Sequence, residues 1–244
     1  MTYCLGILLP AGLVLASDSR SNAGVDQITR VSKLAVIQEV GERVIFIQSA
    51  GNLATTQAVV TQVRQSAGVG VDGQDIMTAK TMFDVAAVVG AALREVMDRD
   101  QKYVEPYGDA TGAFLVSGQI AGEPPRLFQV YDAGNFIEAS ERACFLQIGE
   151  TKYGKPILDR ALTLGSDLDE AAKLALLSFD ATIRSNLSVG PPIDLMRYDT
   201  DSLSAERLET LGEDTPYWRE LGRAYSKGLS TLVDSLPAPP AGRP

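Results

Sequence analysis

Hydrophobic residues dominate the start of the chain, MTYCLGILLPAGLVLASDSR, and are interrupted only by a Pro-Ala-Gly sequence. Two short apolar runs joined by such a turn are typical of a β-hairpin, so we predict strands over Tyr3–Leu9 and Leu13–Ser17. A secretory signal carries basic residues ahead of its apolar stretch, whereas the first basic residue here is Arg20. The run is also shorter than the about 20 residues that span a bilayer. We therefore interpret it as a hairpin and not as an export signal.

Beyond the hairpin, the apolar pattern switches between the period of strands and that of helices. Short apolar or alternating stretches predict strands, and apolar positions three and four residues apart predict helices. The predicted strands are Leu34–Gln38, Val44–Gln48, Ala113–Ile120, Leu127–Asp132, Phe136–Ala139, Ala143–Ile148 and Ile193–Tyr198. The predicted helices are a segment capped by Asn52, then Ala79–Lys102, 153–162, 167–187 and Tyr217–Leu236.

The order of these elements predicts the architecture. Two groups of strands, each followed by helices, favour a layered sandwich with helices on its two outer faces. No linker divides the chain, so we predict a single domain over residues 1–236, with a helical extension from about residue 199. The Pro-rich segment 237–244 is expected to be disordered.

Composition and charge exclude several classes of function. The 244 residues are 45% hydrophobic and 22% charged, which is typical of a globular domain with a sizeable core. A net charge of −9 argues against nucleic acid as a partner, and no apolar run suits a membrane span. We expect the two cysteines, Cys4 and Cys144, to be buried free thiols in a reducing cytoplasm, and their spacing matches no zinc-binding pattern.

The chain contains no histidine. This absence removes every Ser-His-Asp and Cys-His arrangement and leaves no conventional zinc site. If the protein is a hydrolase, a carboxylate, a lysine or the chain's own α-amine must accept the proton. We expect neither a metal nor another cofactor.

A candidate set of catalytic residues lies around the hairpin. Thr2 would gain a free α-amine on removal of Met1, and such an amine has a pKa of about 7.7–8.0. Asp18 ends the second strand of the hairpin and Lys33 begins the next strand, so the pair can support a Thr2 alkoxide. Gly51 lies at a strand-to-helix junction that suits an oxyanion donor. The alternative is an ordinary salt bridge beside a frayed end.

A second motif, GETKYGKP over residues 149–156, has the spacing of a phosphate-binding loop. The position that must offer a hydroxyl to magnesium is Pro156, and Glu150 adds negative charge. We therefore interpret this loop as structural and place nucleotide binding last among the alternatives.

The start of the chain, TYCLGILLPAGLVLASDSRSNAG, resembles proteasome β-type subunits, which are amino-terminal-nucleophile hydrolases. The further segments SAGNLATTQAVV, QIGETKYGKPILDR and SFDATIRSNLSVGPPIDL are similar to the bacterial Anbu (ancestral β subunit) branch. The positions in register are Thr2, Gly12, Asp18, Arg20, Gly24 and Lys33. The resemblance implies an α+β fold, specifically a four-layer αββα sandwich.

The resemblance also implies roles for individual residues. Thr2 matches the catalytic threonine, Asp18 and Lys33 its supporting pair, and Gly51 the oxyanion donor. Asn22 and Leu53 match positions that hold an extended substrate, and Ser188 matches a serine that positions the threonine amine. Two positions depart from ordinary β subunits, because Glu150 and Ser185 replace a serine and an aspartate near that amine.

The implied activity is a cytoplasmic threonine hydrolase that cleaves peptide or related amide bonds through an acyl-enzyme on Thr2. The family implies homo-oligomers that form rings or shallow helical assemblies. The alternative is a non-catalytic assembly subunit that retains the fold. A two-ring bacterial threonine protease working with an ATPase is less favoured, because of the extra length after Tyr198.

Overall fold

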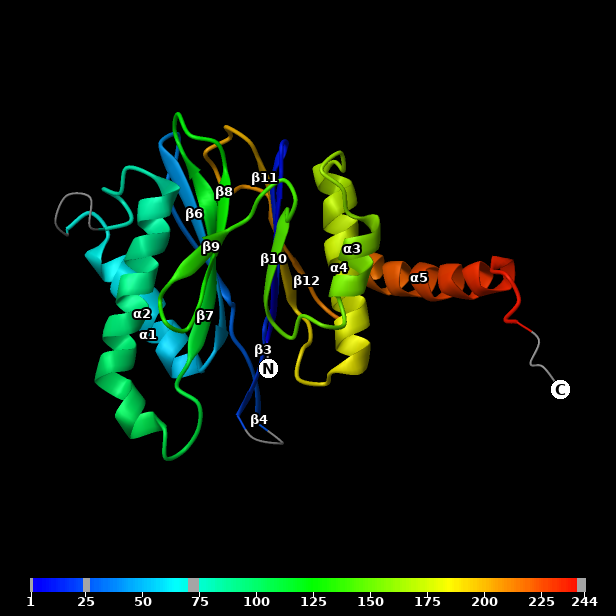
Figure 1. Ribbon diagram of the computed structural model, residues 1–244, viewed down its shortest axis with the longest axis horizontal. Helices are drawn as coiled ribbons and strands as arrows, with labels where there is room; N and C mark the ends of the chain where they lie inside the picture. The colour runs from blue at the N-terminus through cyan, green and yellow to red at the C-terminus, as the bar shows by residue number, and fades with distance from the viewer. Residues whose placement is uncertain (1, 24–26, 70–74, 241–244) are drawn as a thin grey trace.

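The computed structural model describes residues 2–23, 27–69 and 75–240, so Met1, Gly24 and the last four residues of the Pro-rich segment lie outside the described part. Two five-stranded antiparallel sheets are stacked face to face (Figure 1). Helices α1 and α2 cover one outer face, α3 and α4 cover the other, and α5 projects away from the stack. This arrangement confirms the predicted αββα sandwich.

The first sheet carries the amino-terminal hairpin at its centre, with strand order β10-β1-β2-β11-β12. Gly12 begins the second strand of the hairpin with φ +145°, and a Cβ there would lie 1.9 Å from the Tyr198 carbonyl oxygen. The close contact between the backbone of Gly12 and that of Tyr198 in the neighbouring strand therefore requires glycine. The strands are β1 (Tyr3–Leu9), β2 (Gly12–Asp18), β10 (Phe145–Gly149), β11 (Ile193–Asp199) and β12 (Leu208–Leu211).

The second sheet is a meander in which each strand pairs with its neighbour in the sequence. Its strands are β5 (Leu34–Glu39), β6 (Arg43–Gly51), β7 (Gly112–Ile120), β8 (Arg126–Val130) and β9 (Phe136–Glu138). A separate two-stranded ribbon of β3 (Arg20–Ala23) and β4 (Gln27–Arg30) leaves the end of β2. The prediction contained neither this ribbon nor β12.

The helices begin where their side chains can cap free N–H groups. Asn52 accepts hydrogen bonds from Ala54 and Thr55, as predicted for the cap of α1. Thr81 and Asp84 form a capping box, so α2 begins at Met82 and not at Ala79. The helices are α1 (Leu53–Ser66), α2 (Met82–Val104), α3 (Lys155–Ala161), α4 (Leu168–Ser185) and α5 (Pro216–Ser235).

Three apolar clusters match the three interfaces between the four layers. One lies between the two sheets and includes Phe46, Leu115 and Tyr198. The other two lie between each sheet and its pair of helices. Because β1 and β2 are buried on both faces, the hairpin is a rigid base for the residues at its end.

Candidate active site at the end of the first hairpin

Thr2 lies immediately before β1, and its backbone is fixed by the neighbouring strand β10. Its carbonyl oxygen accepts a hydrogen bond of 2.7 Å from the Glu150 N–H. Tyr3 pairs with Gly149 across the sheet. Gly149 has φ +83°, and a Cβ there would lie 1.9 Å from the Thr2 carbonyl oxygen. Only glycine fits beside Thr2 in this geometry.

Beside this end of β1, a buried ion pair joins Asp18 to Lys33. The Lys33 Nζ lies 2.7 Å from the Asp18 Oδ1, and it also donates to the Arg20 carbonyl oxygen at 2.7 Å. An ammonium group has three N–H donors. In the described part of the chain two of them are used, which leaves one for a neighbouring oxygen.

Asp18 is tied directly to the residue that follows Thr2. Its Oδ1 accepts a hydrogen bond of 3.0 Å from the Tyr3 N–H, and its Oδ2 accepts one of 3.3 Å from the Gly190 N–H. Burial raises the pKa of the Asp18 carboxyl, while the Lys33 ammonium and these hydrogen bonds oppose the rise. The carboxylate therefore depends on Lys33 and on the backbone donors to stay charged.

A cavity of about 530 Å³ opens at Thr2. Thr2, Gly51 and Leu53, three of the predicted site residues, all line it. The neighbouring β3 contributes Ser21 to the lining. Asn22 follows in β3, where its backbone pairs with Ile28, and its side chain lies outside the described part. The other lining residues are Ala50, Asn52, Asp109 and Gly149.

Gly51 turns the chain from β6 into α1 at the wall of this cavity. Its φ is +116°, and a Cβ there would lie 2.5 Å from the Thr111 carbonyl oxygen. The Asn52 side chain closes the turn by capping α1 and by donating to the Asp109 carbonyl oxygen at 2.9 Å. A rigid turn with a small residue leaves the backbone at Gly51 open to close approach from the cavity.

Ser188 lies in the turn after α4 and is not among the described residues that line the Thr2 cavity. Its N–H donates to the Asn186 Oδ1 at 2.9 Å, and the Asn186 Nδ2 donates to the Glu150 Oε2 at 2.8 Å. Glu150 is buried, and Lys152 lies 3.2 Å from its other oxygen. Ser185 is exposed at the end of α4. Hydrogen bonds therefore connect Ser188 to Thr2 only indirectly, through Asn186 and Glu150.

The sequence did not identify Gly149, Ser21 and Asp109 as site residues. Gly149 begins the segment that has phosphate-loop spacing, but its backbone packs against Thr2. At the other end of that segment, Lys155 pairs with Asp159 at 2.6 Å within α3. The segment therefore supports the end of β1, in agreement with the structural interpretation. Only the pairing of β1 with β10 reveals this.

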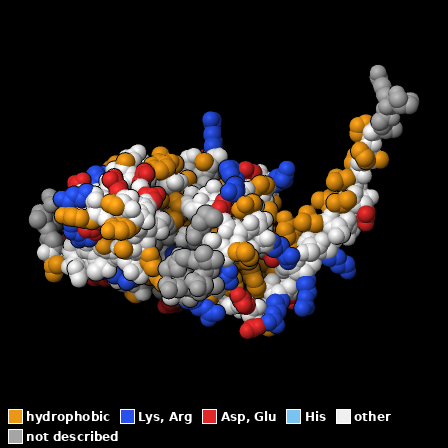
Figure 2. All heavy atoms as spheres, turned by 90° about the horizontal axis from the view of Figure 1, so that it is seen from below, with side chains coloured by type: hydrophobic (Ala, Val, Ile, Leu, Met, Phe, Trp, Pro, Cys, Tyr) orange, Lys and Arg blue, Asp and Glu red, His pale blue; other side chains and the backbone are white. Residues whose placement is uncertain are grey.

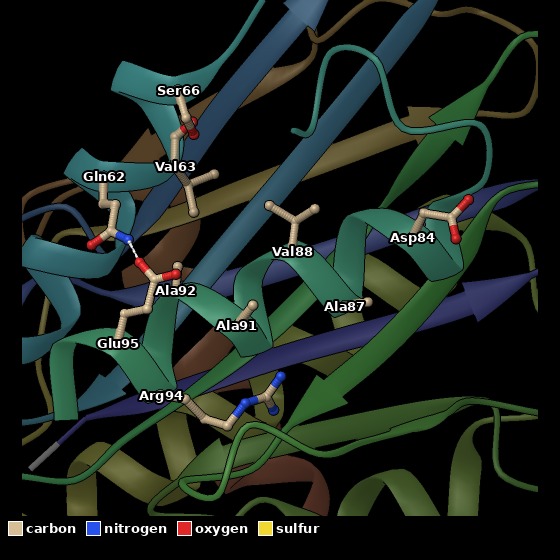
Figure 3. A pocket seen from close by; sticks show the side chains of 10 residues that line it. All are labelled: Gln62, Val63, Ser66, Asp84, Ala87, Val88, Ala91, Ala92, Arg94 and Glu95. Atoms are coloured by element: carbon tan, nitrogen blue, oxygen red, sulfur yellow. Dashed lines mark hydrogen bonds between the residues drawn. The ribbon is translucent and has the colours of Figure 1, made fainter. Parts of the chain in front are cut away.

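A larger cavity, of about 560 Å³, lies between α1 and α2 on the outer helical layer. Ala and Val make up half of the residues that line it, and Figure 3 shows Gln62 hydrogen-bonded to Glu95. Its polar side chains are engaged within the helices: the Ser66 hydroxyl donates to the Val63 carbonyl oxygen, and Asp84 forms the capping box of α2. We therefore place the candidate chemistry in the Thr2 cavity.

Other kinds of site find no support in the described residues. The Cys, Asp and Glu residues described by the structure form no group that suits a metal ion. None of the helices described there is long and apolar enough to cross a membrane. Cys4 is a buried free thiol as predicted, whereas Cys144, also free, is only half-buried and lies directly before β10.

Comparison with known proteins places this geometry among proteasome-like structures, although no protein-family model matches the chain. Anbu from Yersinia bercovieri is 44% identical with a TM-score of 0.92, over 99% of this chain and 100% of that one. The helical assembly of the Anbu complex from Pseudomonas aeruginosa is 46% identical with a TM-score of 0.92, over 98% of each chain. Proteasome subunit alpha 1 of Haloferax volcanii is 25% identical over 214 residues, which are 87% of this chain and 77% of that protein.

Proposed function

The chain belongs to the Anbu family of proteasome-like proteins, and we propose that it is a threonine hydrolase that cleaves peptide or related amide bonds. One observation carries the proposal. The Thr2 cavity opens at the end of β1, where the buried Asp18–Lys33 pair is hydrogen-bonded to the residue next to Thr2. Removal of Met1 would place a hydroxyl and a free α-amine together in that cavity.

In the proposed reaction the Thr2 hydroxyl oxygen attacks the substrate carbonyl carbon, and the α-amine accepts the hydroxyl proton. The C–N bond breaks, the proton passes to the leaving amine, and an ester remains on Thr2. Water then hydrolyses the ester, with the α-amine again taking and returning a proton. The chain has no histidine, so the α-amine is the base that suits neutral pH best.

The surrounding residues have complementary roles in this proposal. The third N–H of Lys33 stabilises the developing Thr2 alkoxide, and Asp18 holds Lys33 in place. Gly51 offers its N–H to the oxyanion. Leu53 and Asn22 hold an extended substrate along the cavity, and Ser188 orients the α-amine through the Asn186–Glu150 connection.

We further propose that the protein works in the cytoplasm as a homo-oligomer. A reducing compartment suits its two free thiols. A relative 46% identical over 98% of this chain is described as a helical assembly. We do not propose an ATPase partner.

One feature favours the alternative of a non-catalytic assembly subunit. The buried Glu150 carboxylate belongs to the residue whose N–H bonds to Thr2. A carboxylate close to an amine favours the ammonium form, which cannot act as a base. In the structure this carboxylate is engaged by Asn186 and Lys152. The two functions therefore differ in whether Glu150 stays bound to these partners or turns towards the amine.

Treatment with a β-lactone that acylates amino-terminal threonines tests the proposal, with intact-protein mass as the readout. We expect a species that lacks Met1 and carries one adduct on Thr2. Thr2→Ala is the matched control and should take no adduct. A chain that keeps Met1 and takes no adduct would support the non-catalytic subunit.

A further inference from the structure

The Thr2 cavity has an acidic wall. Among the described residues that line it, Asp109 is the only one with a charged side chain. Asp109 is exposed and lies in the loop between α2 and β7. Lys33 is buried and is not among the lining residues. A substrate in this cavity therefore meets a negative charge that no described lining residue neutralises.

A neighbouring cavity of about 320 Å³ has the same electrostatic character. It shares Ala50, Gly51 and Gly149 with the Thr2 cavity, and the charged residue among its described lining residues is Asp132. Figure 2 views the molecule from the lower side of Figure 1 and shows Lys and Arg interspersed with Asp and Glu over this face. The acidic character is therefore a local property of the two cavities.

The Asp109 carboxylate is oriented by its own loop. Its two oxygens accept hydrogen bonds of 2.9 Å from the N–H and from the hydroxyl of Thr111. A carboxylate has about four acceptor sites, so each oxygen retains the capacity to accept a further hydrogen bond. Neither oxygen is paired with a Lys or Arg of the described chain. The loop thus presents to the cavity an oriented carboxylate that a cation can still bind.

This loop is also bonded to the turn that carries Gly51. The Asn52 Nδ2 donates to the Asp109 carbonyl oxygen at 2.9 Å, and the Asn52 N–H donates to the Thr111 carbonyl oxygen at 2.8 Å. A third hydrogen bond of 2.8 Å joins the loop to the first turn of α1. Because Gly51 is the proposed oxyanion donor, these bonds fix Asp109 relative to the substrate carbonyl that Gly51 would hold.

We infer that Asp109 is a specificity-determining residue and that the preferred substrate has a basic side chain, Lys or Arg, on the residue that supplies the scissile carbonyl. The inference rests on the proposed hydrolysis at Thr2 and names its substrate class. An ammonium or guanidinium group pairs with the open side of the carboxylate at the cavity wall. An acidic side chain is repelled at the same place, so the discrimination depends on charge.

Peptide epoxyketones, which form a covalent adduct with an amino-terminal threonine, test this preference. Three probes share an acetyl-Ala-Ala segment and carry Lys, Glu or the neutral norleucine next to the reactive group. Intact-protein mass over time gives each rate for the full chain after removal of Met1. We expect the Lys probe to react at least about tenfold faster than the Glu probe, because attraction to Asp109 is replaced by repulsion.

Variants that change only the charge separate specificity from loop structure. Asp109→Asn keeps an oxygen that can accept from the Thr111 N–H, and the ratio of the Lys rate to the Glu rate should fall to within about twofold. Asp109→Lys should reverse the preference. Asp159→Asn, at an exposed aspartate of α3, is the matched control and should keep the wild-type ratio. In wild type the ratio should also fall as salt is added, because ions screen an accessible charge pair.

The possible outcomes distinguish this inference from the proposed function. Adducts that form equally fast with the Lys and Glu probes, or faster with Glu, would overturn the inference and leave hydrolysis at Thr2 standing. A wild-type ratio retained in Asp109→Asn would also overturn it. So would a ratio lost only in Asp132→Asn, since the neighbouring cavity would then make the selection. No adduct with any of the three probes overturns the proposed function and this inference together.

Discussion

The end of β1 and the end of α5 are built in opposite ways. At Thr2, backbone pairing, a buried ion pair and a glycine that tolerates no Cβ fix the described surroundings of the residue within one chain. At the end of α5, every residue from Ser226 to Ser235 is exposed, and four large apolar side chains are between 45% and 65% exposed: Leu229, Leu232, Val233 and Leu236. The comparison teaches that the surroundings of Thr2 are fixed by packing within one subunit, whereas the end of α5 is not packed by its own subunit. Changes at the first region should therefore cost stability, and changes at the second should cost the single subunit little.

The largest effect is expected from Asp18→Ala. It leaves the Lys33 ammonium buried without its partner, and breaking a buried ion pair costs about 3–5 kcal/mol of unfolding free energy. Denaturant unfolding measures the loss. Asp159→Ala is the control, because it removes an exposed partner of Lys155 and should cost at most about 1 kcal/mol. Equal losses in the two variants would show that the buried pair is not a structural support.

A smaller loss of unfolding free energy is expected from Gly149→Ala. The new Cβ would lie 1.9 Å from the Thr2 carbonyl oxygen in a left-handed backbone, so strain and overpacking together cost about 3 kcal/mol. Gly122→Ala has a similar φ of +87° but no atom within 4 Å, so it should cost only about 1 kcal/mol. Thermal unfolding measures the stability of the two variants against wild type. If Gly122→Ala were the more harmful, the close approach at Thr2 would be wrong.

The next effect depends on pH and comes from Tyr3. Burial raises the pKa of Tyr3 from 10.0 to about 12, against hydrogen bonds with Ser178 and Gln147. As the pH rises, Tyr3 loses its hydroxyl proton in the unfolded chain before it does so in the folded chain. The folded state is therefore fully stabilised by neutral Tyr3 below pH 10, and this stabilisation is lost as the pH rises to about 12. Two pKa units correspond to about 3 kcal/mol. Tyr3→Phe should unfold with a shallower pH dependence in this window, and an unchanged slope would contradict the assignment.

The smallest effect on stability is expected at the end of α5. Leu232→Ala should change the unfolding free energy by less than about 0.5 kcal/mol, because the side chain is 52% exposed and belongs to none of the apolar clusters of the described chain. Denaturant unfolding over a dilution series measures this. A loss of 2 kcal/mol or more, about the cost of truncating a core leucine, would place Leu232 inside the subunit's own core.

Much of the fold could be predicted from the sequence, because the sandwich strands are apolar on both faces and the long helices keep a clear period. The ribbon β3–β4 and strand β12 were missed, since RSNA, QITR and LETL are short, polar and without alternation. Their pairing depends on the strands they leave and join. The shift of the start of α2 to Met82 follows from the Thr81 capping box, which the apolar pattern alone does not fix.

The candidate site was predictable where it is local and unpredictable where it depends on long-range pairing. Asp18 lies one hairpin away from Thr2, so their proximity follows from the turn. Gly149 meets Thr2 only because β10 pairs with β1, a contact between residues far apart in the chain. The placement of Ser188 behind Asn186 and Glu150 likewise depends on tertiary structure.

The rate at which a β-lactone acylates Thr2, compared between wild type and Lys33→Ala, tests the central claim most directly. The claim is that the buried pair at the end of β1 activates the Thr2 hydroxyl. Intact mass over time gives the rate, and circular dichroism confirms that both proteins are folded. The account predicts one adduct in wild type and no measurable acylation in folded Lys33→Ala. Equal rates in the two proteins would contradict it.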